Sequence, residues 1–152
     1  MDDLGGFRLT GTRLERLRGV STRPTTARAI NDRGDVAGGE AIRGFPYQAL
    51  LWQRSNVRAL GTLVAVAPGG PDPTAMAHDV DVHGRVVGES NPGIAPTPLP
   101  FLWDRGVMTR LPTPDARPTG IARAINSYGL IVGEIQGTQE SFAAAWIPEP
   151  AR

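Results

Sequence analysis

The fold of this chain is decided by a stretch that occurs three times: ARAINDRGDVAGGE at residues 27–40, AHDVDVHGRVVGES at residues 77–90 and ARAINSYGLIVGEI at residues 122–135. The eighth residue of every copy is a glycine: Gly34, Gly84 and Gly129. The copies are therefore 50 and then 45 residues apart, and a period of this length indicates a repeat architecture. An apolar run that closes on tryptophan follows each copy, at Trp52, Trp103 and Trp146. Because these tryptophans recur at one position, we expect them in the core between repeats.

Four short strands can be placed in each repeat. A turn that starts with Asn or Asp and ends in glycine separates the first two, as hairpins require. The third strand closes on tryptophan, and the fourth is the VRAL segment (57–60) or the MTRL segment (108–111). No helical period lies between them, so the chain is predicted to be all-β. Four antiparallel strands are the content of one β-propeller blade, so we expect a single domain over residues 1–152 with three blade-like repeats at about 27–61, 77–111 and 122–147.

The ends of the chain complement one another. The third repeat runs into Pro148 without a fourth strand, while LERL at residues 14–17 matches the fourth strands of the other repeats. We expect this N-terminal strand to complete the last blade, because that pairing removes exposed edges. Propellers have 4–8 blades, so three repeats predict half of a six-bladed propeller, completed by homodimerisation. One alternative is a monomeric β-trefoil or β-prism, which also has four strands per repeat; a larger ring or an open stack of repeats is the other.

Composition excludes several classes of protein. The 152 residues contain no cysteine, which excludes a disulfide scaffold, a zinc–thiolate site and a cysteine nucleophile. The formal net charge is only +1, so nucleic acid is not an expected partner. All 16 basic residues are arginine, and seven of them lie between Arg8 and Arg33, which suits either an anionic partner or a solvated surface. No apolar stretch reaches 18 residues and no signal peptide is readable, so we expect a cytoplasmic protein without a membrane partner.

The repeats also carry the pattern of a known family. It consists of Ala-x-x-Ile-Asn-x-x-Gly-x-Val-x-Gly, an apolar stretch ending in Leu-Trp, and a Leu-Gly closing strand; the matches are residues 27–38, 51–52, 60–61, 102–103 and 122–133. The opening Asp3-Leu4-Gly5-Gly6 echoes the closing segment. On these residues the chain resembles the HAF repeats of bacterial, often extracellular, proteins. The resemblance implies propeller-like blades and no defined activity. The middle repeat departs from the pattern, with His78, Asp79, Asp81 and His83 in place of the usual residues.

Alignment of the repeats brings out one candidate site. Arg28, His78 and Arg123 share a position near the end of the first strand, and Gly39, Glu89 and Glu134 share another. First strands line the channel of a propeller, so these cations would ring a polar funnel, with four arginines and two histidines in a twofold dimer. A carboxylate, phosphate or polyoxygenated small molecule suits such a funnel. The candidate ligand-binding residues are Arg28, His78, Arg123 and Glu134. The competing interpretation is that they cap strand ends and face water.

A catalytic interpretation rests on the middle repeat. His78, oriented by Asp81 or Glu89, would be an acid–base catalyst, so these three are the candidate catalytic residues of a cofactor-independent cyclase, isomerase or hydrolase, for example in secondary metabolism. Asp81, however, aligns with the turn residues Asn31 and Asn126. The His-x-x-Asp-x-His spacing is not specific for a metal, and we expect no metal and no cofactor. The sequence does not decide whether the protein is an enzyme. It favours a binding protein whose partners are a small molecule and a second copy of itself.

Overall fold

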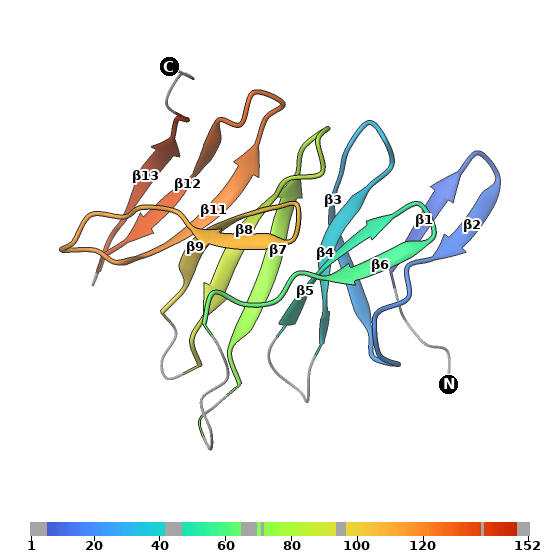
Figure 1. The fold of residues 1–152 in the computed structure, drawn as a ribbon, viewed down its shortest axis with the longest axis horizontal. Coiled ribbons are helices and arrows are strands. Elements are labelled where there is room, and N and C mark those ends of the chain that lie inside the picture. Colours follow the sequence, from blue (N-terminus) through green and yellow to red (C-terminus); the bar gives the residue numbers. More distant parts are fainter. Residues whose placement is uncertain are drawn as a thin grey trace.

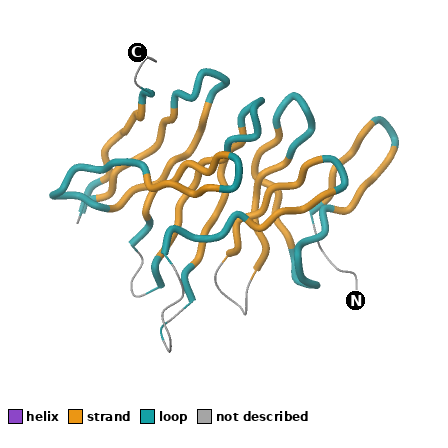
Figure 2. The backbone as a smooth tube through the Cα atoms, in the orientation of Figure 1, coloured by secondary structure: helices purple, strands orange, loops and turns teal. Residues whose placement is uncertain are grey.

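A computed structural model describes residues 6–41, 47–64, 70, 72–93, 97–137 and 139–148. Every regular element in these ranges is a strand (Figure 2), which confirms the all-β prediction. The described part of the chain holds no helix that is long and apolar enough to cross a membrane. The described residues do not include residues 3–5, which belong to the opening segment that echoes the closing strand. They also do not include parts of the loops at 65–71 and 94–96.

The thirteen strands form four open antiparallel sheets. The first is a hairpin of β1 (Phe7–Thr10) and β2 (Arg13–Arg16). The first repeat forms the sheet of β3 (Thr25–Ile30), β4 (Val36–Ala41), β5 (Tyr47–Gln53) and β6 (Asn56–Ala59). The second forms β7 (Thr74–Val80), β8 (Val86–Asn91), β9 (Leu99–Asp104) and β10 (Val107–Arg110). The third forms β11 (Thr119–Ile125), β12 (Ile131–Gln136) and β13 (Ser141–Trp146).

These sheets follow one another along the longest axis of the molecule, in chain order (Figure 1). Within each sheet the strands also pair in chain order, so every connection is a simple antiparallel one. The first strands of the three repeats are neighbours, because β7 contacts both β3 and β11. The residues of these three strands therefore lie side by side across the molecule.

The predicted turn between the first and second strands is the same in all three repeats. In the first, the Oδ1 atom of Asn31 accepts hydrogen bonds from the backbone N–H groups of Arg33 and Asp35, and Gly34 has a φ of +78°. The equivalent bonds are made by Asp81 and Asn126. A short side chain that accepts from its own backbone starts each turn, and a glycine that tolerates positive φ ends it.

A β-bulge interrupts each first strand at the position that aligned in the sequence. The register shifts between Ala27 and Ala29, and the equivalent shifts leave the extra residues Arg28, His78 and Arg123. Opposite each bulge stands a glycine of the second strand. At Gly38 a Cβ atom would lie 1.9 Å from the carbonyl oxygen of Thr26. The final glycine of the repeat pattern is therefore required because the bulged backbone approaches it too closely for a side chain.

The core lies between successive sheets. Ala37 and Leu51 of the first repeat pack on Val80 and Trp103 of the second, while Val87 of the second packs on residues of the third. The predicted core position of the tryptophans is confirmed, since all three join these clusters. Two also donate a 2.7 Å indole hydrogen bond to the chain just before their own repeat: Trp52 to the carbonyl of Arg18 and Trp146 to that of Pro112.

Within one chain, the N-terminal strand does not complete the last blade. Residues 14–16 belong to β2, which pairs with β1 and lies at the opposite end of the molecule from β13 (Figure 1). Leu17 holds it there: its side chain is buried against Val36, Leu50 and Trp52. The hairpin is thus the outer half of a further sheet that precedes the first repeat. Closure within the chain would cost these contacts and would have to span the full length of the molecule.

Candidate ligand-binding site

The three bulge residues form a row across the first strands. Arg28 lies on β3, His78 on β7 and Arg123 on β11, and these strands are consecutive neighbours. A bulge turns its extra residue away from the regular alternation of the strand. Each repeat therefore places a basic or titratable residue at the bulge of its first strand; Arg28 and Arg123 are exposed there, whereas only 8% of the His78 side chain is exposed.

Two members of this row already hold a carboxylate. The Nε2 atom of His78 lies 3.2 Å from Oε1 of Glu89, and Nη2 of Arg123 donates a 2.8 Å hydrogen bond to Oε1 of Glu134. The first repeat has Gly39 where the others have glutamate. Arg28 is exposed and has no hydrogen-bond or ion-pair partner within the residues that the structure describes. One guanidinium of the row is therefore available to an external anion.

Asp81 does not join this group. Its Oδ1 atom accepts from the backbone N–H groups of His83 and Arg85, and Oδ2 accepts a 2.6 Å bond from Nε of Arg85. The side chain is completely buried. No hydrogen bond links it to His78 or Glu89 in the described ranges. Of the three predicted catalytic residues, the structure brings His78 and Glu89 together and commits Asp81 to the turn and to Arg85.

Two carboxyl groups away from the row have a lowered pKa. Burial of Asp35 acts to raise its pKa, but hydrogen bonds from Asn31, Arg33 and Gln53 outweigh burial and hold the pKa below the ordinary value of 3.8. The hydrogen bond from Arg8 lowers the pKa of Glu15, against a smaller opposing effect of burial. Both carboxylates are therefore structural anions of the first repeat and its preceding hairpin.

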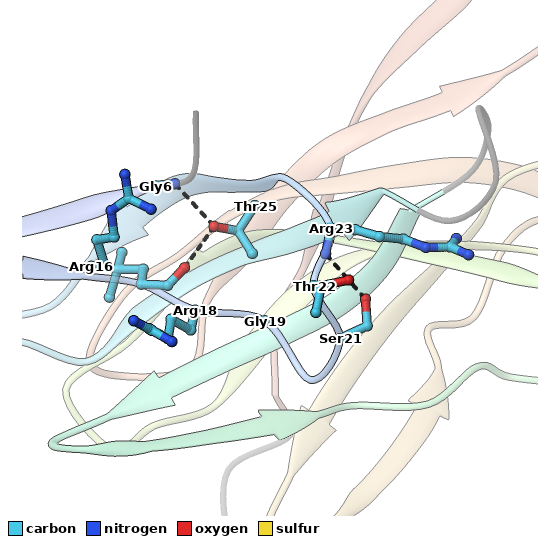
Figure 3. A pocket seen from close by; sticks show the side chains of 9 residues that line it. Gly6, Arg16, Arg18, Gly19, Ser21, Thr22, Arg23 and Thr25 are labelled. Atoms are coloured by element: carbon cyan, nitrogen blue, oxygen red, sulfur yellow. Dashed lines mark hydrogen bonds between the residues drawn. The ribbon is translucent and has the colours of Figure 1, made fainter. Parts of the chain in front are cut away.

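A second arginine cluster was not singled out in the sequence. A cavity of about 160 Å³ lies beside the hairpin and is lined by Arg16, Arg18 and Arg23, with the Thr25 hydroxyl tying Gly6 to Leu17. In Figure 3 the three guanidinium groups point in different directions. They do not converge on one anion, so this cavity is a weaker candidate than the bulge row. The arginine-rich stretch was visible in the sequence, but the direction of each side chain was not.

The described residues contain no group of three or more His, Asp or Glu side chains placed to hold a metal ion. Comparison with models of protein families, with curated proteins and with solved structures finds no match to this chain. The functional interpretation therefore depends on the geometry of the bulge row.

Proposed function

We propose that this chain is a β-propeller binding protein of the HAF-repeat kind that holds a small anionic ligand on the bulge row. The observation that carries the proposal is the difference between the repeats. At one position, two repeats pair a cation with a carboxylate of their own chain, and the first repeat offers the same kind of cation, Arg28, without one. A carboxylate or phosphate of the ligand would take the place that Glu89 and Glu134 occupy in the other repeats.

Arginine suits this role because its planar guanidinium binds a carboxylate or phosphate through two parallel hydrogen bonds. Arg123 is half-exposed and lies two strands from Arg28. A ligand with two anionic groups would therefore contact Arg28 through one and reach toward His78 or Arg123 with the other. The proposed ligand is a small polycarboxylate or phosphate compound.

The propeller part of the proposal requires a second copy. The first and last sheets, with β1 and β13, lie at opposite ends of the molecule (Figure 1), and an open row of sheets leaves exposed faces at both. Two copies would provide six repeats, within the range of 4–8 blades found in closed propellers. In that ring the bulge residues of both copies would surround the hub.

Binding is preferred to catalysis because the proposed acid–base set loses Asp81 to the turn. What favours an enzyme is the remaining pair of His78 and Glu89. The two functions differ in what substitution of His78 changes. In a binding protein His78→Ala alters affinity, whereas in an enzyme it abolishes turnover at little cost in affinity.

The experiment is a calorimetric and NMR titration with citrate and with inorganic phosphate. Arg28→Ala is expected to weaken the binding of citrate about 10-fold to 100-fold, the effect of losing a hydrogen bond to a charged group. Arg105→Ala is the matched control, because Arg105 is an exposed arginine in the turn between β9 and β10. Equal affinities for the two variants, or no saturable binding of either anion by the native chain, would contradict the proposal.

A further inference from the structure

The two ends of the molecule expose residue positions that the repeats bury in its interior. Val132 on β12 is 50% exposed, whereas the equivalent Ala37 and Val87 are fully buried. Ile30 on β3 is 61% exposed, whereas the equivalent Val80 and Ile125 are buried. Each end therefore presents one half of a contact that is complete inside the chain.

The interior shows how the two halves fit. Ala37 and Val80 belong to one core cluster, and Val87 and Ile125 belong to the next. In both cases the second strand of one repeat packs on the first strand of the following repeat. Among the described residues, no first strand follows Val132 and no second strand precedes Ile30, because the β1–β2 hairpin supplies only the outer half of a sheet.

Most of the side chains around both residues are apolar. Around Val132 lie the exposed side chains of Leu130, Ala143 and Ala145, which we call the C-terminal face. Ile30 and Ala27 border a cavity of about 280 Å³ beneath the hairpin, which we call the N-terminal face; its other lining residues are apolar except for Arg8 and Arg28. Small and branched apolar side chains of this kind make up the interior contacts between repeats. Because the chain carries both halves of such a contact, a second copy of the chain can complete it at each end.

We propose that the C-terminal face of one copy docks on the N-terminal face of a second copy, with Val132 packed against the partner's Ile30. Two such contacts, related by a twofold axis, close a pair of chains, since each copy uses its C-terminal face once and its N-terminal face once. This inference rests on the proposed ring for its closure, but it does not depend on the ligand.

Closure also decides which outer strand is used. β13 and the partner's β1 are both third strands, and the composite sheet has room for one of them beside β2. β13 is anchored by Trp146, which packs between sheets and bonds to Pro112, whereas Phe7 and Leu9 of β1 are each 62% exposed. Displacement of β1 breaks the two bonds from Arg8 to the carbonyls of Gly34 and Arg54, and the buried contact of β13 has to outweigh this loss. β13 therefore displaces the partner's β1 and pairs with β2, which then serves as the missing fourth strand.

The test is the mass in solution, measured by light scattering on the full chain. The native chain is expected at about twice 16.2 kDa. Val132→Arg and Ile30→Glu should each weaken the pair roughly 100-fold, since each buries an unpaired charge in the contact. Combining V132R and I30E in one chain should restore the pair, because opposite charges then meet across the contact. Val107→Glu is the control, since Val107 is 64% exposed but lies on β10, outside both faces.

A native chain that stays monomeric, or single variants that pair like the native chain, would overturn the inference. If circular dichroism shows both single variants folded but the combined variant does not pair, the inference is also overturned. That result would mean that each face meets its own copy, so that V132R and I30E do not compensate each other. Hydrogen exchange should show residues 7–10 less protected in the pair than in the V132R variant. A titration with citrate, run in parallel, separates the proposals: a monomer that binds citrate refutes the contact alone, and a pair that does not bind refutes the ligand alone.

Discussion

Replacing Gly88 with alanine tests why each repeat has a glycine opposite the bulge of its first strand. Gly88 stands on β8 opposite the bulge at His78, and an added Cβ would lie 1.9 Å from the carbonyl oxygen of Met76 and 2.9 Å from the ring of Phe101. Real Cβ atoms essentially never approach a neighbour closer than 3.0 Å. The backbones of β7 and β8 must therefore separate by roughly 1 Å.

The size of the effect follows from what that separation breaks. The clashing atom is a backbone oxygen of Met76, which is buried on β7 between two sheets, and Phe101 is fully buried, so neither neighbour can turn aside. Two hydrogen bonds beside the bulge would be lost or strained, at about 1 kcal/mol each, and overpacking adds about 1–3 kcal/mol. Gly88→Ala should lower the free energy of unfolding by about 3–5 kcal/mol, or the melting temperature by roughly 6–20 °C for a domain of this size.

The assay is urea unfolding monitored by tryptophan fluorescence, with Gly106→Ala as the matched control. Gly106 has a φ of +95° but nothing within 4 Å of an added Cβ, so its replacement costs only the backbone strain of about 1–2 kcal/mol. Gly88 itself has no positive φ, so equal losses would mean that the contact at the bulge costs no more than ordinary backbone strain. The close approach at the bulge would then not be the reason for the glycine.

Three further outcomes follow from the turns. Asn31→Ala should cost about 1–2 kcal/mol more unfolding free energy than Asn126→Ala in urea unfolding, because the amide of Asn31 also donates to the Asp81 carbonyl of the next repeat and to Oδ2 of Asp35; equal losses would show that these two bonds contribute nothing. Asp81→Asn should lower the free energy of unfolding by about 1–3 kcal/mol, because it weakens the contact with Arg85, and should leave the affinity for citrate unchanged. A drop in citrate affinity would show that Asp81 belongs to the ligand-binding site. The lowered pKa of Asp35 adds stability that is complete above pH 3.8 and is lost as the pH falls through the folded-state value. When the unfolding free energy is measured at a series of pH values, Asp35→Asn should therefore show a smaller loss of stability at acid pH than the native chain. The same loss in both proteins would contradict this prediction.

The N-terminal hairpin shows how far sequence matching reaches. Residues 14–17 were predicted to be a fourth strand, and Leu17 does bond as the closing leucines do: its N–H donates to Gly6, as that of Leu60 donates to Ala49. Its partner β1 was missed, because Leu9 stands where the other third strands have tryptophan. Local likeness identified the kind of strand, but only packing against Val36 and Trp52 decided where it lies.

The bulge was also beyond sequence analysis. Alignment placed Arg28, His78 and Arg123 at one position, but a residue count cannot show that the register shifts there. The glycine opposite was visible as part of the repeat, without a reason. That reason appears only when the two strands are paired, because a Cβ atom on the glycine would then overlap a carbonyl oxygen of the neighbouring strand.

By itself, the sequence determined the all-β class, the three repeats and their turns, because these follow from interactions among residues close together in the chain. Asn31, Asp81 and Asn126 each close a turn with their own backbone, so their role is the same wherever the sheet lies. Tertiary structure decided which charges remain available. In the tertiary structure Asp81 pairs with Arg85, and Arg28 has no partner among the described residues. The reason is that burial and pairing of a side chain depend on the residues that the neighbouring strand and the next sheet place beside it.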